Sequence, residues 1–190
     1  MTYGRGNRAV EALRGIDFEL KSGECLGLLG ANGSGKSTTL KLVLGILRPT
    51  AGDLVVLGGP AGRRKARAAT GYVPEEARRF GALSGRETVD LFARLQGVRG
   101  RVDRKRRVED ALEVVGLTPK ARGQRLSTYS RGMARRLAMA AAWVHAPRLL
   151  VLDEPTSGLD PLGAEELLAL LDKHRRRGGA TLLSTHDRVT

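Results

Sequence analysis

The sequence predicts an α/β fold in which a mixed, mainly parallel sheet carries a helical insertion at about residues 75–142. A glycine-rich segment at residues 30–38 lies between a short apolar run and a helix-like pattern. Residues 149–152 form a continuous aliphatic run, which is typical of a strand buried on both faces of a parallel sheet. Between these two segments apolar residues recur every three or four positions, which is typical of helices.

The strands follow from short apolar or alternating runs. Residues 16–20 alternate apolar and polar side chains, as a half-buried strand does, and residues 25–29 form an apolar run just before the glycine-rich segment. Further strands are expected at residues 53–57, 71–74, 149–153 and 180–185.

The helices follow from periodicity and from their end signals. Ser84 and Glu87 have the spacing of a capping box, so a helix is expected to begin there and run to about residue 95. A second helix carries apolar residues from Val108 to Val115, and a third begins near Ser130. A last helix is expected at residues 163–177, and Trp143 is expected to pack in or near the core.

Residues 30–38 fit the pattern G-x-x-x-x-G-K-[ST], between a strand and a helix. Glycines let the backbone N–H groups turn inward around a phosphate, and the helix N-terminus adds partial positive charge. In this setting Lys36 reaches the β- and γ-phosphates of a nucleotide, and the Ser37 hydroxyl holds Mg²⁺. The segment therefore predicts a P-loop NTPase core.

Two adjacent carboxylates, Asp153 and Glu154, end the aliphatic run. A carboxylate at a strand end beside a phosphate loop positions Mg²⁺. The neighbouring carboxylate polarises an attacking water. The pair therefore predicts nucleotide hydrolysis rather than binding alone.

Composition indicates the compartment and the kinds of partner that suit the chain. The chain has 190 residues and a net charge of +13, and residues 60–136 hold 20 Lys/Arg against 8 Asp/Glu. This basic region fits either an anionic partner or, as we favour, a solvated helical face. Cys25 is the single cysteine, which is typical of a reducing, cytoplasmic setting. No apolar run has the length of a membrane span.

Taken together, the motifs resemble the nucleotide-binding domain of an ABC (ATP-binding cassette) transporter, of the exporter-type two-component kind. Residues 149–155 resemble the Walker B segment, residues 157–160 the D-loop, and His186 the switch histidine. Residues 129–133 resemble the family signature, with Ser130 and Gly132 kept. The resemblance spans nearly the whole chain, and the motifs occur in the family's order.

The resemblance implies that residues 1–190 are a single ABC ATPase domain, short at both ends, that binds and hydrolyses ATP with Mg²⁺. It implies a head-to-tail homodimer or heterodimer, in which Ser130 and Gly132 of one copy face the phosphate loop of the other. It also implies a separate transmembrane permease that docks on the segment from Glu75 to about Val98, and a position at the inner face of the cell membrane. No direct contact with nucleic acid is expected.

The site residues follow from the motifs and the resemblance. The catalytic set is Lys36, Glu154 and His186. The metal ligands are Ser37, Asp153 and Glu75. The nucleotide-binding set is Tyr3, Asn32, Gly33, Ser34, Gly35, Lys36, Ser37, Thr38, Ser130, Gly132 and Asp160.

The chain departs from the family pattern at several positions. The signature has Tyr129, Arg131 and Met133 where leucine, glycine and glutamine are usual, and Glu75 stands at the place of the Q-loop glutamine. Tyr3 is either the aromatic residue that stacks on adenine or an exposed terminal tyrosine. The alternative function is that of an ABC protein acting on the ribosome or on DNA, for which the basic region offers some support.

Overall fold

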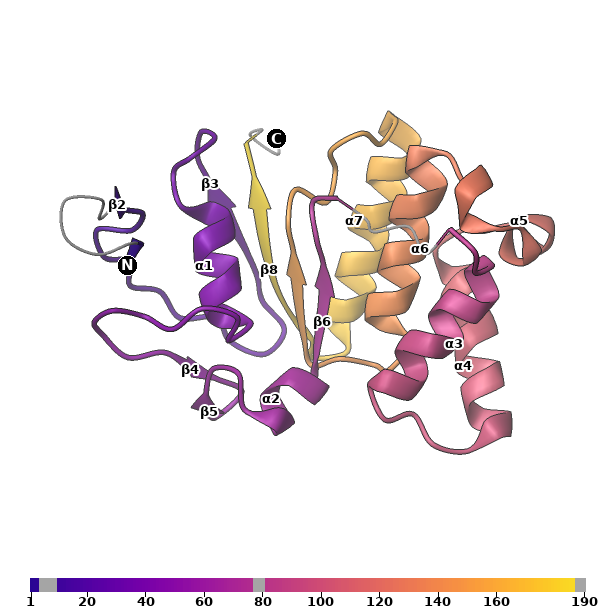
Figure 1. The fold of residues 1–190 in the computed structure, drawn as a ribbon, viewed down its shortest axis with the longest axis horizontal. Coiled ribbons are helices and arrows are strands. Elements are labelled where there is room, and N and C mark those ends of the chain that lie inside the picture. Colours follow the sequence, from indigo (N-terminus) through magenta and orange to yellow (C-terminus); the bar gives the residue numbers. More distant parts are fainter. Residues whose placement is uncertain (4–9, 77–80, 187–190) are drawn as a thin grey trace.

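The computed structural model describes residues 1–3, 10–76 and 81–186, and four parallel strands form its centre (Figure 1). The strand order in this sheet is β3-β8-β7-β6. Their bounds are β3 Cys25–Leu29, β6 Thr70–Val73, β7 Leu149–Leu152 and β8 Ala180–Thr185. The α/β fold predicted from the sequence is confirmed.

Antiparallel pairing in the described ranges comprises two separate two-stranded ladders and one isolated bridge between Ser84 and Arg125. One pairs β1 (Thr2–Tyr3) with β2 (Val10–Glu11), and the other pairs β4 (Val55–Val56) with β5 (Gly59–Pro60). Leu57 and Gly58 connect β4 to β5, and both have positive φ, as a tight two-residue hairpin turn requires.

Two of the expected strands differ from the structure. Residues 16–20 form no strand: within the described ranges no neighbouring strand pairs with them, and Ile16 and Phe18 are 47% and 41% exposed. Alternation alone does not make a strand when a hydrogen-bonding neighbour is lacking. The strand expected at residues 53–57 shortens to two residues, because the chain turns at Leu57.

The helices begin and end largely where the sequence predicts. The capping box of Ser84 and Glu87 is formed, and Ser130 and Asp160 cap the helices that follow them. The helices are α1 Lys36–Val43, α2 Arg64–Ala68, α3 Gly85–Leu95, α4 Arg101–Val114, α5 Pro119–Gly123, α6 Arg131–Trp143 and α7 Pro161–Arg176. None of the helices in the described ranges is long and apolar enough to cross a membrane.

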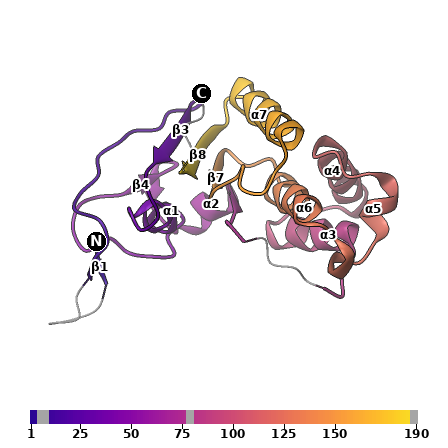
Figure 2. The ribbon, with the colours of Figure 1, turned by 90° about the horizontal axis from the view of Figure 1, so that it is seen from above.

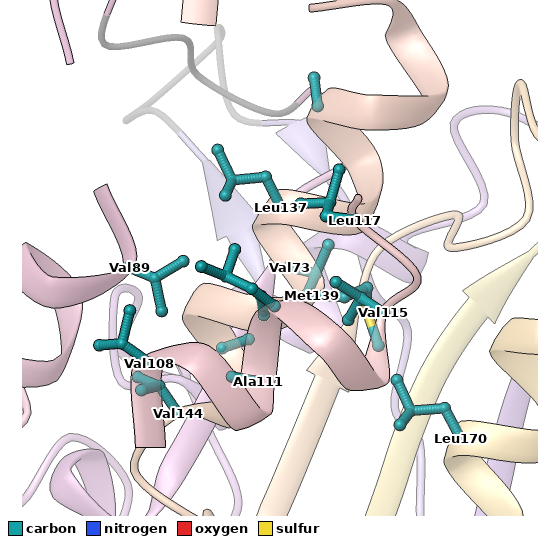
Figure 3. Close-up of a cluster of buried hydrophobic side chains, with 14 of the residues drawn as sticks. Val73, Val89, Val108, Ala111, Val115, Leu117, Leu137, Met139, Val144 and Leu170 are labelled. Atoms are coloured by element: carbon teal, nitrogen blue, oxygen red, sulfur yellow. The ribbon is translucent and has the colours of Figure 1, made fainter. Parts of the chain in front are cut away.

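The sheet separates two apolar clusters because side chains alternate along its strands. On β7, Leu149 and Val151 pack with Leu40 of α1, whereas Leu150 and Leu152 pack into the larger cluster with the helices between β6 and β7 and with α7. Figure 3 shows the larger cluster, in which Leu137 of α6 lies among residues from several elements. Seen from above, α7 and α1 lie on opposite sides of the sheet (Figure 2).

The parallel register brings four chain segments to one edge of the sheet. Leu29 pairs with Thr185, Leu152 pairs with Leu183, and Val73 pairs with Leu152. Loops that leave the carboxyl ends of parallel strands meet at the same edge, which is where ligands bind in open α/β sheets. The segments that follow β3, β6, β7 and β8 therefore emerge side by side.

The basic region is partly neutralised within the helices. Asp90 accepts hydrogen bonds from Arg94 and Arg104, and Asp103 accepts them from Arg106 and Arg107. Glu109 pairs with Arg86 and Arg122. Because each of these acids serves two arginines, the helical surface keeps a positive excess.

His174 gives the fold a pH dependence. Its ring packs 5.1 Å from that of Trp143, and its Nε2 lies 3.3 Å from the Ala180 carbonyl oxygen. Burial lowers the pKa of His174, and the Ala180 carbonyl opposes this in part. In the unfolded chain the pKa of His174 is about 6.5. As pH falls below this value, the unfolded chain therefore takes up a proton before the folded chain does, and the fold loses stability.

We therefore expect the free energy of unfolding to fall as pH is lowered from 7.5 to 5.5, and to fall less in His174→Gln. Urea unfolding of both proteins at the two pH values measures this difference. Equal losses in the two proteins would exclude His174 as a source of the pH dependence.

Candidate functional site

The predicted phosphate-binding segment, residues 30–38, follows β3 and ends at the first turn of α1. Gly33 and Gly35 have φ values of +82° and +95°, a left-handed conformation that glycine adopts at little cost. A Cβ on Gly35 would lie 2.7 Å from the Ala12 carbonyl oxygen, so no other residue fits there. Among the described residues no side chain caps the N-terminus of α1, and an uncapped helix N-terminus is favourable for an anion.

Lys36 lies across this segment. Its Nζ donates hydrogen bonds to the carbonyl oxygens of Gly30, at 2.6 Å, and Ala31, at 3.3 Å. The same nitrogen lies 3.5 Å from Glu154 Oε1, and both side chains are less than a tenth exposed. The lysine predicted to bind phosphate and the carboxylate predicted to act as general base are therefore in contact in a largely buried place.

Asp153 and Glu154 follow β7 and are both buried. Ser37 Oγ donates a hydrogen bond to Asp153 Oδ1 at 3.2 Å, so two of the three predicted metal ligands are in contact. Ser184 of β8, which is fully buried, donates to the same Asp153 oxygen at 2.6 Å and accepts from the Glu154 N–H at 2.9 Å.

Glu154 has a positive φ of 48°, which is uncommon outside glycine. Its carboxylate is held between two basic side chains: Oε1 faces Lys36, and Oε2 lies 2.8 Å from His186 Nδ1. His186 follows β8 and half of its side chain is exposed. The structure thus brings the three predicted catalytic residues, Lys36, Glu154 and His186, into one chain of contacts.

Sequence reasoning missed Ser184 and Arg135. Arg135 reaches from α6 to the backbone carbonyls of the segment that carries Glu154. Burial lowers the pKa of Arg135, and the nearby charges of Asp153, Glu75 and Glu154 act in the opposite direction. The sequence contains no signal for either residue, because one serine in a strand and one arginine in an arginine-rich stretch are ordinary.

The oxygen atoms of Ser37 and Asp153 suit a magnesium ion. Mg²⁺ prefers oxygen ligands, and it is commonly held by one or two carboxylates together with substrate phosphates and waters. In the described ranges no three His, Cys, Asp or Glu side chains gather closely enough to hold a metal by themselves. Glu75 is exposed, and its backbone carbonyl accepts a hydrogen bond from Arg135. The role of Glu75 as a metal ligand stays a prediction.

The predicted signature residues Ser130 and Gly132, and Asp160 of the predicted D-loop, lie apart from the phosphate-binding segment. Ser130, Gly132 and Asp160 line an open hollow of about 640 Å³, together with residues of α5. Ser130 accepts a hydrogen bond from the Met133 N–H, and Asp160 accepts one from the Gly163 N–H. Figures 1 and 2 place α5 at one end of the molecule and α1 in the other half, so one chain does not bring this hollow to its own phosphate loop.

The remaining predicted residues are placed as follows. Asn32, Gly33 and Ser34 are exposed in the phosphate-binding segment, and Thr38 is half-buried in α1. Tyr3 pairs with Val10 through the β1–β2 ladder. Its side chain lies outside the described part of the chain, so its adenine contact stays a prediction.

Tyr129, one of the departures in the signature, has a structural reason. Its side chain is buried, and its hydroxyl donates a hydrogen bond to the Ala121 carbonyl oxygen at 2.7 Å. A Cβ on Gly85 would collide with that hydroxyl. Tyr129 therefore ties the start of α6 to α5 and α3.

The fold and the phosphate-binding segment define a P-loop nucleotide-binding core. The sequence matches the family described as ABC transporter over residues 13–157. The chain belongs to this family.

Two relatives are resistance proteins. The chain is 38% identical over 189 residues to the doxorubicin resistance ATP-binding protein DrrA of Mycobacterium tuberculosis, covering 97% of this chain and 55% of DrrA. It is 36% identical over 176 residues to the linearmycin resistance ATP-binding protein LnrL of Bacillus subtilis, covering 92% and 56%. The chain spans about half the length of the curated relatives it matches.

A solved structure agrees with the fold. The ATP-binding cassette MJ0796, as a dimer in a post-hydrolysis state bound to ADP and Pi, superposes with a TM-score of 0.89 at 26% identity. The match covers 98% of this chain and 84% of that one.

Ser184→Ala should lower the free energy of unfolding by about 1–3 kcal/mol, because it leaves the buried Glu154 N–H without its acceptor. Urea unfolding measures the loss. Ser127→Ala, at an exposed position, is the matched control and should change stability by less than about 0.5 kcal/mol. Equal stability changes in the two variants would contradict this role of Ser184.

Proposed function

We propose that this chain is the ATP-binding and ATP-hydrolysing part of an ABC transporter that powers a separate membrane permease, most simply an exporter. The observation that carries the proposal is the contact chain Ser37–Asp153 and Lys36–Glu154–His186 at the end of the sheet. The relatives named for drug resistance support transport over an action on the ribosome or on DNA.

In this proposal ATP binds with its phosphates against the N–H groups of residues 33–38. Lys36 exchanges its carbonyl partners for the β- and γ-phosphate oxygens and neutralises their charge. Ser37 and Asp153, with Glu75 as a further candidate, would hold Mg²⁺, which when bound adds positive charge beside the phosphates. Phosphoryl transfer depends mainly on positioning and on charge stabilisation, so this set is chemically sufficient.

Glu154 orients the attacking water and takes its proton. Its carboxylate is held between the side chains of Lys36 and His186, which supports a fixed direction for the attacking water. His186 leaves Glu154 to contact the γ-phosphate when nucleotide is bound. Its half-exposed side chain supports this movement.

The hollow formed by Ser130, Gly132 and Asp160 supports a head-to-tail dimer. Since the hollow and the phosphate loop lie in different halves of one chain, a second copy or a related cassette would bring its signature to this phosphate loop. The dimeric structure of MJ0796, bound to ADP and Pi, supports dimerisation.

A groove of about 600 Å³ supports the docking of the permease. Its walls come from α1, α2 and β6 on one side and from α3 and α6 on the other, with Pro74, Glu76, Phe92 and Gln96 among the lining residues. These residues belong to, or adjoin, the segment from Glu75 to about Val98, which the resemblance to the family implies as the docking surface for the permease. In this proposal the chain works in the cytoplasm at the inner face of the cell membrane.

Glu154→Gln should keep ATP affinity and lose about 10²- to 10⁴-fold in the rate of hydrolysis, because it removes the general base. Phosphate release by the purified chain measures the rate, and equilibrium binding of a fluorescent ATP analogue measures the affinity. Glu165→Gln, at an exposed position of α7, is the control and should hydrolyse at the parent rate. A Glu154→Gln variant with normal turnover would remove this residue from the role of base.

Lys36→Ala should weaken ATP binding by about tenfold or more, since a hydrogen bond to a charged group contributes about 1.5–3 kcal/mol. Lys41→Ala, on an exposed position of the same helix, should bind ATP as the parent does. Unchanged affinity in Lys36→Ala would count against the phosphate-loop assignment.

A further inference from the structure

Arg135 is a buried arginine that donates hydrogen bonds to five backbone carbonyl oxygens. It lies in α6 and is 6% exposed. Its Nη1 donates to Pro74, at 2.7 Å, and to Glu75, at 2.8 Å. Its Nη2 donates to Asp153, at 2.9 Å, and to Glu154, and its Nε donates to Pro155, at 3.2 Å.

A guanidinium suits this position better than any other side chain. Burying a charge is costly unless hydrogen bonds satisfy it, and arginine offers five N–H donors in a rigid fork. The fork holds two segments at once: residues 74–75, which follow β6, and residues 153–155, which follow β7. Lysine offers one compact charge and glutamine only two donors, so neither reproduces both attachments.

The attachment at residues 153–155 fixes the backbone of Glu154 on both sides. Arg135 binds its carbonyl, and Ser184 accepts a hydrogen bond from its N–H. Glu154 has φ of +48°, and a non-glycine residue keeps such a conformation only when its surroundings impose it. This backbone conformation aims the carboxylate at Lys36 and His186.

The attachment at residues 74–75 adjoins the groove. Pro74 and Glu76 line the groove, as do Ala134 and Ala138 of α6, which stand on either side of Arg135 in the sequence. Residues 74–76 and α6 therefore form part of the groove wall and are also the two segments that the Arg135 hydrogen bonds at Pro74 and Glu75 connect. A shift of residues 74–76 would change the hydrogen bonds that Arg135 makes to the Glu154 segment.

We propose that Arg135 is a positioning residue for ATP hydrolysis, which holds the Glu154 carboxylate in place and links it to the groove wall at Pro74 and Glu75. The proposal rests on the proposed function, since it concerns the hydrolysis of ATP by Glu154. Arg135 itself does not reach the nucleotide site: its contacts are with the backbone that carries the general base. Its loss therefore affects the rate of hydrolysis and leaves the binding of ATP in place.

The test compares Arg135→Gln and Arg135→Lys with Arg122→Gln in the purified chain. Arg122 is a matched control, because its side chain is 11% exposed and also donates to a backbone carbonyl, that of Leu117. The other hydrogen bond of this side chain in the described part of the chain is to Glu109. For Arg135→Gln we expect kcat to fall by about 10- to 100-fold, since a small misplacement of a reacting group has effects of this size. The KM for ATP and the affinity for the fluorescent analogue should change less than about twofold, as expected when an interaction specific to the transition state is lost.

Arg135→Lys should recover part of the rate, and Arg122→Gln should keep the parent kcat even if it loses stability. A folded Arg135→Gln or Arg135→Lys variant with the parent kcat would overturn the proposal. So would a loss of ATP affinity as large as the loss of kcat, because that result describes a general structural role. If Arg135→Gln does not fold, Arg135→Lys decides by the same measurements.

The parent chain separates this test from that of the proposed function. If the parent does not hydrolyse ATP, or if Glu154→Gln hydrolyses it as fast as the parent, the proposed function fails. If the parent hydrolyses ATP, Glu154→Gln does not, and the Arg135 variants keep the parent kcat, only the role of Arg135 fails.

Discussion

The backbone at Asp153 and Glu154, where β7 ends, is the constraint on which the rest of the site depends. Ser184 holds it from the neighbouring strand, and Arg135 holds it from α6. Because β8 lies between β3 and β7 in one parallel sheet, this turn emerges at the same sheet edge as the phosphate loop and His186. The direction of the Glu154 carboxylate is therefore set by sheet register and by two buried polar side chains, and not by the motif itself.

The two apolar clusters of the molecule lie on opposite faces of the sheet that carries this backbone. One cluster packs α1 against the sheet, and the other packs the helices between β6 and β7, together with α7, against its opposite face. Apolar packing is non-directional and tolerates small shifts, whereas the hydrogen bonds of a buried guanidinium have fixed geometry. Arg135 thus fixes the position of α6 relative to the segments that follow β6 and β7, beside the candidate site. Tyr129 separately fixes the start of α6 against α5.

Much of this arrangement could be predicted from local sequence, and the rest could not for physical reasons. The phosphate loop and the cap at Ser84 are local patterns, so their structure follows from a few adjacent residues. The expected strand at residues 16–20 failed because pairing needs a neighbour, which local alternation does not reveal. Arg135 was missed because its burial depends on two segments, about 20 and 60 residues away, that only the folded chain brings to it.

The measurement that tests this account most directly is a double-mutant cycle between Arg135→Gln and Glu154→Gln, read as ATP hydrolysis under single-turnover conditions. If Arg135 acts only through Glu154, the double variant hydrolyses ATP at the residual rate of Glu154→Gln alone. If the double variant is slower than Glu154→Gln by the factor that Arg135→Gln imposes on the parent, the two residues act independently. That result would contradict the claim that Arg135 positions the catalytic carboxylate.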